Sequence, residues 1–290
     1  MYIKIIDHIE GGIILGFENK FVNNKTITTK RKRFNISGNL TKYLGTGIIL
    51  LLLGIWLLIT ETGIVQPLFL PSPITIIETL FILIVEGYNY IPMWQHVLAS
   101  VLRALVGFGL AVILGVPLGL LMGYNKYMYA IFGPIFAFLR PIPPIAYVPL
   151  MVLWFGIGET SKVLMIFLAA FLYINLNCMN GIRTVPNLWL QAGRNLGLNH
   201  GKLFFRVIVP SAMPSIFTGI KTGLAVSWSI LVAAELIVAQ QGLGFMIMDA
   251  ATFYRIPIVY VGVGLIGLIG VILDFTVSQL EKRILHWTGK

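Results

Sequence analysis

The sequence predicts an all-α, polytopic membrane protein with about six transmembrane helices. The first observation is composition: 57% of the 290 residues are hydrophobic and 11% are charged, whereas soluble domains contain about 45–50% apolar and about 25% charged residues. The second is a series of apolar segments near the roughly 20 residues that a helix needs to cross a bilayer. The third is the concentration of basic residues between these segments. Together they exclude a soluble enzyme, a disordered chain and a disulfide-built secreted domain.

Six apolar segments are long enough to be transmembrane helices. They are residues 44–60, 97–123, 131–156, 163–178, 216–238 and 258–280. A seventh apolar run, residues 74–85, is too short to span and carries Glu78, so we expect a helix on or near the membrane surface. The segments predict two parts of the chain, a cytoplasmic basic tail of residues 1–43 and a transmembrane domain of residues 44–290.

Lysine and arginine residues fall mainly on one side of the predicted spans. They gather in residues 1–43, in the loop of residues 179–215 and at the C-terminus, whereas residues 61–96 contain none. Because positively charged loops stay in the cytoplasm, we predict that both termini and this loop are cytoplasmic and that the chain lies in the inner membrane. This distribution accounts for the net charge of +10, so no nucleic-acid partner is expected.

The sequence lacks the patterns of catalytic and metal-binding sites. It has no G-x-x-x-x-G-K-[ST] phosphate loop, and its single cysteine, Cys178, excludes a multi-cysteine metal site. Its histidines are scattered through tail and loop positions, at His8, His96, His200 and His286. The acidic residues Glu235 and Asp274 lie near predicted span ends, where surface exposure or helix capping is the ordinary explanation. We therefore expect no catalytic residue, metal or cofactor, and an energy source outside this chain.

The predicted third span is rich in proline and contains Arg140. Interior prolines break a helix, and broken backbone is tolerated at membrane depth only where it is buried in protein or lines a watery cavity. Two interpretations remain open: a gate or pathway for an anionic or zwitterionic solute, or a kinked packing helix in which Arg140 pairs with a carboxylate or reaches the surface. The candidate pathway residues here are Arg140, Pro141, Pro143 and Pro144.

The predicted fifth span carries a polar face that includes Ser227 and Trp228. A polar face on an apolar helix suits the wall of a pathway. It also suits ordinary hydrogen bonding between helices, and both interpretations remain open for these two residues.

The loop between the predicted fourth and fifth spans has the most specific pattern. Within residues 186–210 we expect two short helices that are joined near Gly197, the second of which ends by Pro210. Leu203 and Phe204 belong to an apolar face of the second helix. Taken alone, this pattern fits any amphipathic hairpin that lies on a membrane.

The spacing in this loop resembles the EAA loop of ABC-importer permeases. That pattern is Glu-Ala-Ala, three residues, Gly, nine residues, Ile, one residue, Leu-Pro. Gln191, Ala192 and Gly193 take the first three places, and Gly197 and Pro210 fall at the Gly and Pro positions. Gln replaces Glu, Gly replaces the second Ala, and valines replace the Ile and Leu. The glutamine removes any salt bridge that the usual glutamate makes.

Further motifs extend the resemblance over about residues 44–287. They are PLFLP at 67–71, WQH at 94–96, RPIPP at 140–144, PLMVLWFGIGETSK at 149–162, AAELI at 233–237 and GLGFM at 242–246. In this order they resemble the permease family for taurine, aliphatic sulfonates and nitrate, and most of all its taurine permeases.

The resemblance implies a type I ABC-importer permease that translocates taurine or a similar small alkanesulfonate. Two permease subunits, which we expect to be identical, would form one pathway within the membrane lipid. Two ATP-binding cassette subunits would hold ATP and Mg, and a periplasmic or lipid-anchored solute-binding protein would deliver the solute. Residues 191–210, within the coupling loop of residues 186–210, would be the coupling helix, and Leu203 and Phe204 would anchor its contact with the ATPase.

Three alternatives stay open. The chain could be a permease for nitrate or another small anion, because the binding protein usually selects the ligand. It could be a secondary transporter or channel that works without an ATPase, although its spans contain few acidic residues. The third alternative is a membrane scaffold or receptor without transport activity.

Overall fold

The computed structural model describes residues 38–288, and the side chains of residues 44–287. The predicted tail of residues 1–43 lies outside the described residues except for its last six, which begin α1 (Gly38–Glu61). The chain forms two units, Met1–Leu51 and Leu52–Lys290, so the described part of the first unit is the N-terminal half of α1.

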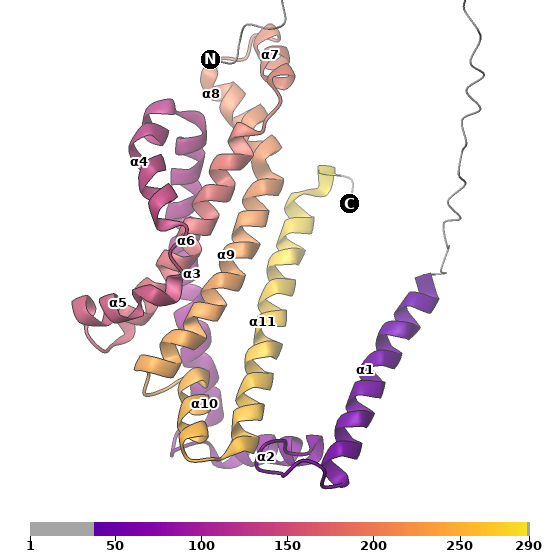
Figure 1. The fold of residues 1–290 in the computed structure, drawn as a ribbon. Coiled ribbons are helices and arrows are strands. Elements are labelled where there is room, and N and C mark those ends of the chain that lie inside the picture. Colours follow the sequence, from indigo (N-terminus) through magenta and orange to yellow (C-terminus); the bar gives the residue numbers. More distant parts are fainter. Residues whose placement is uncertain (1–37, 289–290) are drawn as a thin grey trace, which may run out of the picture. The chain divides into compact units, whose positions relative to one another are not determined.

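Four long helices form the frame of the second unit (Figure 1). They are α3 (Met93–Tyr124), α6 (Glu159–Arg183), α9 (Val209–Val238) and α11 (Ile256–Ile284). α6 is the central helix, because it packs against both α3 and α9 and half of its most apolar stretch is buried. Glycines allow this close approach: a Cβ at Gly119 of α3 would lie 2.6 Å from the carbonyl oxygen of Asn175 in α6.

The described residues include five helices that are long and apolar enough to cross a membrane, or six when one bent pair counts as a span. The bent pair is the predicted third span. Its parts are α4 (Lys126–Leu139), the 3-10 helix η1 (Pro144–Tyr147) and α5 (Val148–Phe155), and α4 meets the η1–α5 segment at 93°. The break coincides with Pro141, Pro143 and Pro144, which cannot continue an α-helix. The expected number of spans and the broken third span are both confirmed.

Two shorter helices lie at the lower end of the bundle in Figure 1. α2 (Pro73–Glu86) forms over the predicted apolar run, and the hydroxyl of Ser72 caps it by accepting from the N–H of Thr75. α10 (Leu243–Thr252) was not predicted from the sequence. It packs against α9 and α11, and its Met246 is fully buried in a core that also contains Leu83 of α2.

The opposite end of the bundle carries a helical hairpin. It consists of α7 (Asn187–Asn195) and α8 (His200–Leu203), which is followed by the π-helical turn η2 (Phe204–Ile208). Figure 1 shows α7 and α8 at the tip beyond α6 and α9. The hairpin and the α2–α10 layer therefore mark the two ends of the transmembrane bundle.

Candidate functional site

The turn of the hairpin is built around Gly197, which has a φ of +79°. Its N–H donates to the carbonyl of Arg194 at 2.9 Å, and the N–H of Leu198 donates to the carbonyl of Gly193 at 3.1 Å. This pair of bonds is the Schellman arrangement, in which glycine ends a helix because it adopts the left-handed conformation without strain. The expected turn near Gly197 is confirmed.

The inside of the hairpin is closed by Gly193 and Leu203. Leu203 is 2% exposed, and a Cβ at position 193 would lie 2.5 Å from its Cδ1 atom. The expectation that Leu203 anchors a partner is therefore wrong, since its side chain holds α7 against α8. Phe204 is half-buried, and its ring lies 4.9 Å from that of Tyr124 in an edge-to-face contact.

The outer face of the hairpin is apolar at other positions. Leu188, Leu196 and Phe205 have large exposed side chains, and Leu196 is 81% exposed. Leu188, Ala192 and Leu196 recur at every fourth position, so they lie along one side of α7. Gln191 and Ala192, which take the first two places of the motif, are also exposed. These side chains give the hairpin an exposed apolar face.

The hairpin continues directly into a span. We expected the second helix to end by Pro210, and this is wrong, because His200–Val238 run as one helix of 39 residues. The π turn explains the difference: the N–H of Val209 bonds to the carbonyl of Phe204, five residues earlier. This wider turn accommodates the Pro210 ring and its missing N–H, which would break a regular α-helix.

A cavity of about 130 Å³ lies beside the break in the third span. Its lining residues are Arg140, Ile142, Pro144, Leu172, Tyr173, Leu176, Asn177 and Asn180. The break and α6 thus place one cation among several polar side chains. Within the described part of the chain, Arg140 has no carboxylate within ion-pair distance. Pro141 and Pro143 shape the break without lining the cavity.

The structure does not bring Ser227 and Trp228 to this cavity. The buried hydroxyl of Ser227 donates to the carbonyl of Leu224 at 2.8 Å. The indole N–H of Trp228 donates to the carbonyl of Ile266 in α11 at 3.2 Å. Both contacts correspond to ordinary hydrogen bonding within and between helices.

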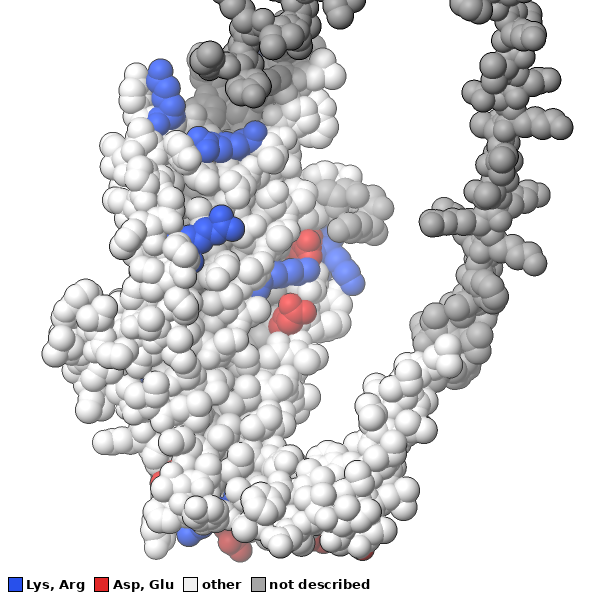
Figure 2. All heavy atoms as spheres, in the orientation of Figure 1, with Lys and Arg blue, Asp and Glu red and all other residues white. Residues whose placement is uncertain are grey.

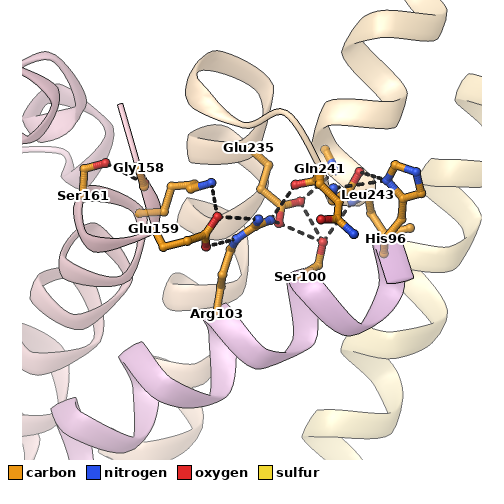
Figure 3. A network of polar contacts seen from close by, with 12 residues as sticks. His96, Ser100, Arg103, Gly158, Glu159, Ser161, Glu235, Gln241 and Leu243 are labelled. Atoms are coloured by element: carbon orange, nitrogen blue, oxygen red, sulfur yellow. Dashed lines mark hydrogen bonds and ion pairs between the residues drawn. The ribbon is translucent and has the colours of Figure 1, made fainter. Parts of the chain in front are cut away.

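A buried polar network lies toward the α2–α10 end and was missed by sequence reasoning (Figure 3). Glu235 of α9 is 1% exposed, so of the two expectations for this residue surface exposure is wrong, whereas its bond to the first turn of α10 agrees with helix capping. Its carboxylate accepts from the hydroxyl of Ser100 at 2.8 Å and from the N–H of Gly244, in the first turn of α10, at 2.9 Å. His96, which we expected in a loop, is fully buried in α3 with one ring nitrogen 3.2 Å from the carbonyl oxygen of Gly242.

Arg103 connects this network to α6. Its Nη1 donates to Glu235 at 2.6 Å and to the carbonyl of Gln241 at 2.7 Å. Its Nε and Nη2 donate to the two oxygens of Glu159 at 2.5 and 2.8 Å. Lys162 donates to the same carboxylate at 2.7 Å. Removing one partner of the buried Arg103–Glu235 pair, which joins α3 to α9, would cost about 3–5 kcal/mol. The link from Arg103 to α6 runs through Glu159, whose side chain is 63% exposed.

A partial signal for the network exists in the sequence. His96, Ser100 and Arg103 recur at helical spacing on α3, so they share one face of a long apolar helix. Polar residues on one face of a span point into the bundle rather than toward lipid. The partners of Arg103 could not be predicted from the sequence, because Glu159 and Glu235 lie 56 and 132 residues away from it.

The chain is similar to one protein family and to several known permeases. The protein family described as "Binding-protein-dependent transport system inner membrane component" matches residues 115–286. The taurine transport system permease protein TauC of Escherichia coli (strain K12) is 38% identical over 93% of this chain and 98% of its own length. The putative aliphatic sulfonates transport permease protein SsuC of Bacillus subtilis (strain 168) is 36% identical over 81% of this chain and 84% of its own.

A permease named for nitrate import and a chain of a solved structure are also similar to this chain. The nitrate import permease protein NrtB of Synechocystis sp. (strain ATCC 27184 / PCC 6803 / Kazusa) is 34% identical over 74% of this chain and 80% of its own length. Among solved structures, a chain of the MetNI methionine ABC transporter in an inward-facing conformation is similar with a TM-score of 0.58 and 18% identity. That similarity covers 66% of this chain and 97% of the other, and at this identity it concerns the fold alone.

Proposed function

Because the chain belongs to the family of binding-protein-dependent transport system inner membrane components, we propose that it carries taurine or a similar small alkanesulfonate into the cell. Membership confirms an ABC-importer permease of the taurine and sulfonate family, a multi-pass inner membrane protein with the type I importer fold. Such a permease is not itself an enzyme and carries no cofactor: ATP binds to a separate ATPase subunit, and a binding protein is the other partner.

The cavity at Arg140 carries the substrate proposal. A guanidinium group beside three polar side chains provides both a charge and hydrogen-bond donors for a small oxyanion. A sulfonate presents three oxygens to such a site. The similarity to TauC, at 38% sequence identity over 93% of this chain, favours taurine as the solute. Nitrate remains the second candidate, because a permease named for nitrate import is also similar.

We propose that the hairpin receives the motion of the ATPase. Its outer face, Leu188, Ala192, Leu196 and Phe205, would dock into the ATPase surface, with Gln191 beside it. Since α8, η2 and α9 form one continuous helix, a shift of the hairpin moves the span without an intervening flexible loop. ATP binding to the ATPase and solute delivery by the binding protein would then act on one two-state element, as coupling between distant sites requires.

The distribution of charges supports an orientation in the membrane. On the face shown in Figure 2, most Lys and Arg side chains lie in the half that carries the hairpin. We propose that this end and both chain termini are cytoplasmic, so that the α2–α10 end faces the binding protein. Residues 44–290 would then form the membrane domain and residues 1–43 a cytoplasmic tail.

We propose a pair of identical permease subunits around one pathway. α5 projects from the bundle in Figure 1 and exposes large apolar side chains at Leu153 and Trp154. An apolar helix in this position suits packing against a second copy of the chain within the membrane.

The substrate proposal is tested by uptake into proteoliposomes that contain the permease–ATPase complex and internal ATP. Labelled taurine is supplied with its binding protein outside, and unlabelled ethanesulfonate or nitrate is added as a competitor. We expect ATP-dependent taurine uptake. Uptake of nitrate with its binding protein, without taurine uptake, would replace taurine by the second candidate.

A further inference from the structure

The guanidinium group of Arg103 has two differently occupied sides. Its Nη1 is held inside the protein by Glu235, which is 1% exposed, and by the carbonyl of Gln241. Its Nε and Nη2 form the parallel fork that recognises carboxylates and other oxyanions, and this fork holds the carboxylate of Glu159. The Nη1 side of the guanidinium is therefore held by groups inside the protein, while its Nε and Nη2 side binds a single carboxylate, that of Glu159.

That carboxylate is on the surface, although its two cations are not. The side chain of Glu159 is 63% exposed, whereas those of Arg103 and Lys162 are 7% and 4% exposed. Figure 3 shows the carboxylate of Glu159, at the start of α6, beside the guanidinium of Arg103, and the ammonium of Lys162 lies 2.7 Å from the same carboxylate. A rotation of its side chain would take the carboxylate into water at little cost in solvation, because most of it is already hydrated.

The charges require an anion in its place. With Glu159 removed, Arg103 and Lys162 leave one positive charge uncompensated beside Glu235, in a buried setting where an unpaired charge is costly. A monoanion that accepts from the fork and from the ammonium restores both the charge balance and the hydrogen bonds. The arrangement is thus a receptor for one small oxyanion, occupied by a carboxylate of the chain itself.

We propose that Arg103 and Lys162 form a binding site for a small oxyanion, of the sulfonate class, from which the ligand displaces Glu159. The inference rests on the proposed function, because it takes the transported solute to be such an anion. The site lies toward the α2–α10 end, and Arg140 lies farther along the bundle, so the solute would meet the Arg103–Lys162 pair before Arg140. Glu159 would keep the two cations paired whenever no solute is present.

The test measures anion binding to the assembled permease–ATPase complex without a binding protein. Labelled taurine, methanesulfonate and nitrate are the probes, in equilibrium dialysis. Glu159→Gln removes the internal competitor and keeps a side chain of the same shape, so methanesulfonate should bind about tenfold more tightly than to the wild-type complex. Adding Lys162→Gln to Glu159→Gln should cancel this gain. Glu281→Gln is the matched control, since it neutralises the carboxylate of the separate Lys221–Glu281 pair.

A second readout guards against a general loss of stability. The increase in unfolding temperature on adding methanesulfonate is compared within each variant, and it should be larger for Glu159→Gln than for the wild type. A lower unfolding temperature with unchanged anion affinity would overturn the proposal and leave the cluster a structural lock.

The same experiment separates this site from the proposed substrate. Tighter binding of nitrate alone in Glu159→Gln would support the oxyanion site and contradict the sulfonate assignment. If no anion binds more tightly, while taurine uptake with the binding protein is normal, the oxyanion site is wrong and the proposed function is retained.

Discussion

Gly193 lies directly against Leu203, and the missing side chain of the glycine is what allows the two helices of the hairpin to touch. A methyl group at position 193 would lie 2.5 Å from the Cδ1 atom of Leu203. The motif of this permease family has alanine at this place, whereas this chain has a glycine that packs against a large leucine on the facing helix. The pair sets the shape of the hairpin surface that we propose docks to the ATPase.

The first prediction concerns this pair. Gly193→Ala should lower transport severalfold, because overpacking of this kind costs about 1–3 kcal/mol unless Leu203 changes rotamer. The double variant Gly193→Ala with Leu203→Val removes the clash and should recover most of the uptake. The measurement is taurine uptake normalised to the amount of complex in the membrane. Equal loss in the single and double variants would show that the two side chains are not coupled.

The second prediction separates backbone strain from charge at Gly197. A Cβ at this position would meet no atom of the chain within 4 Å, so the intrinsic cost is that of a left-handed residue, about 1–2 kcal/mol and less for Asn or Asp. Gly197→Asn should therefore retain most of the uptake, whereas Gly197→Asp should abolish it by placing a charge at the docking surface, with normal membrane insertion of both variants. Normal uptake by Gly197→Asp at normal expression would contradict the docking role.

The third prediction concerns the outer face of the hairpin. Leu196→Asp places a charge where an exposed apolar side chain meets the ATPase, and it should reduce co-purification of the ATPase subunit by about tenfold or more. Leu196→Met keeps the apolar surface and should co-purify normally. Retention of the ATPase by Leu196→Asp would exclude this face as the contact.

The fourth prediction concerns Arg140. Its side chain is exposed and lacks an ion-pair partner among the described residues, so Arg140→Ala should leave assembly of the complex unchanged. Uptake of taurine should nevertheless fall by about tenfold, because the cavity loses its cation. Lys126→Ala, which removes a surface cation at the start of the same helix, serves as the control. Equal uptake in the wild type and Arg140→Ala would favour a packing role for the broken span.

Local features of the fold could be predicted from the sequence. The break of the third span follows from prolines at neighbouring positions, each of which excludes a regular helix. The turn at Gly197 follows from one glycine between two segments of helical periodicity. The positions of the spans can be predicted from hydrophobicity. That these apolar segments are helical follows because a helix satisfies the backbone polar groups of a segment inside the membrane.

The features that depend on tertiary contacts could not be predicted in this way. An apolar stripe on a short helix does not reveal whether it faces a partner or its own hairpin, which is why Leu203 was assigned to the wrong side. Pro210 lies within a continuous helix because a π turn precedes it, and the turn is a property of the folded backbone. The burial of Glu235 could not be predicted, because its partners Ser100 and Arg103 are far away in the sequence.

Transport through the proposed pathway depends on the transfer of energy from ATP hydrolysis on a partner, through the hairpin, to the spans. The most direct measurement is ATP hydrolysis by the purified permease–ATPase complex, with and without taurine-loaded binding protein. We predict stimulation of ATP hydrolysis that requires taurine and that is lost in Gly197→Asp. Failure of any ATPase subunit to bind the chain, or stimulation that Gly197→Asp leaves intact, would contradict this mechanism.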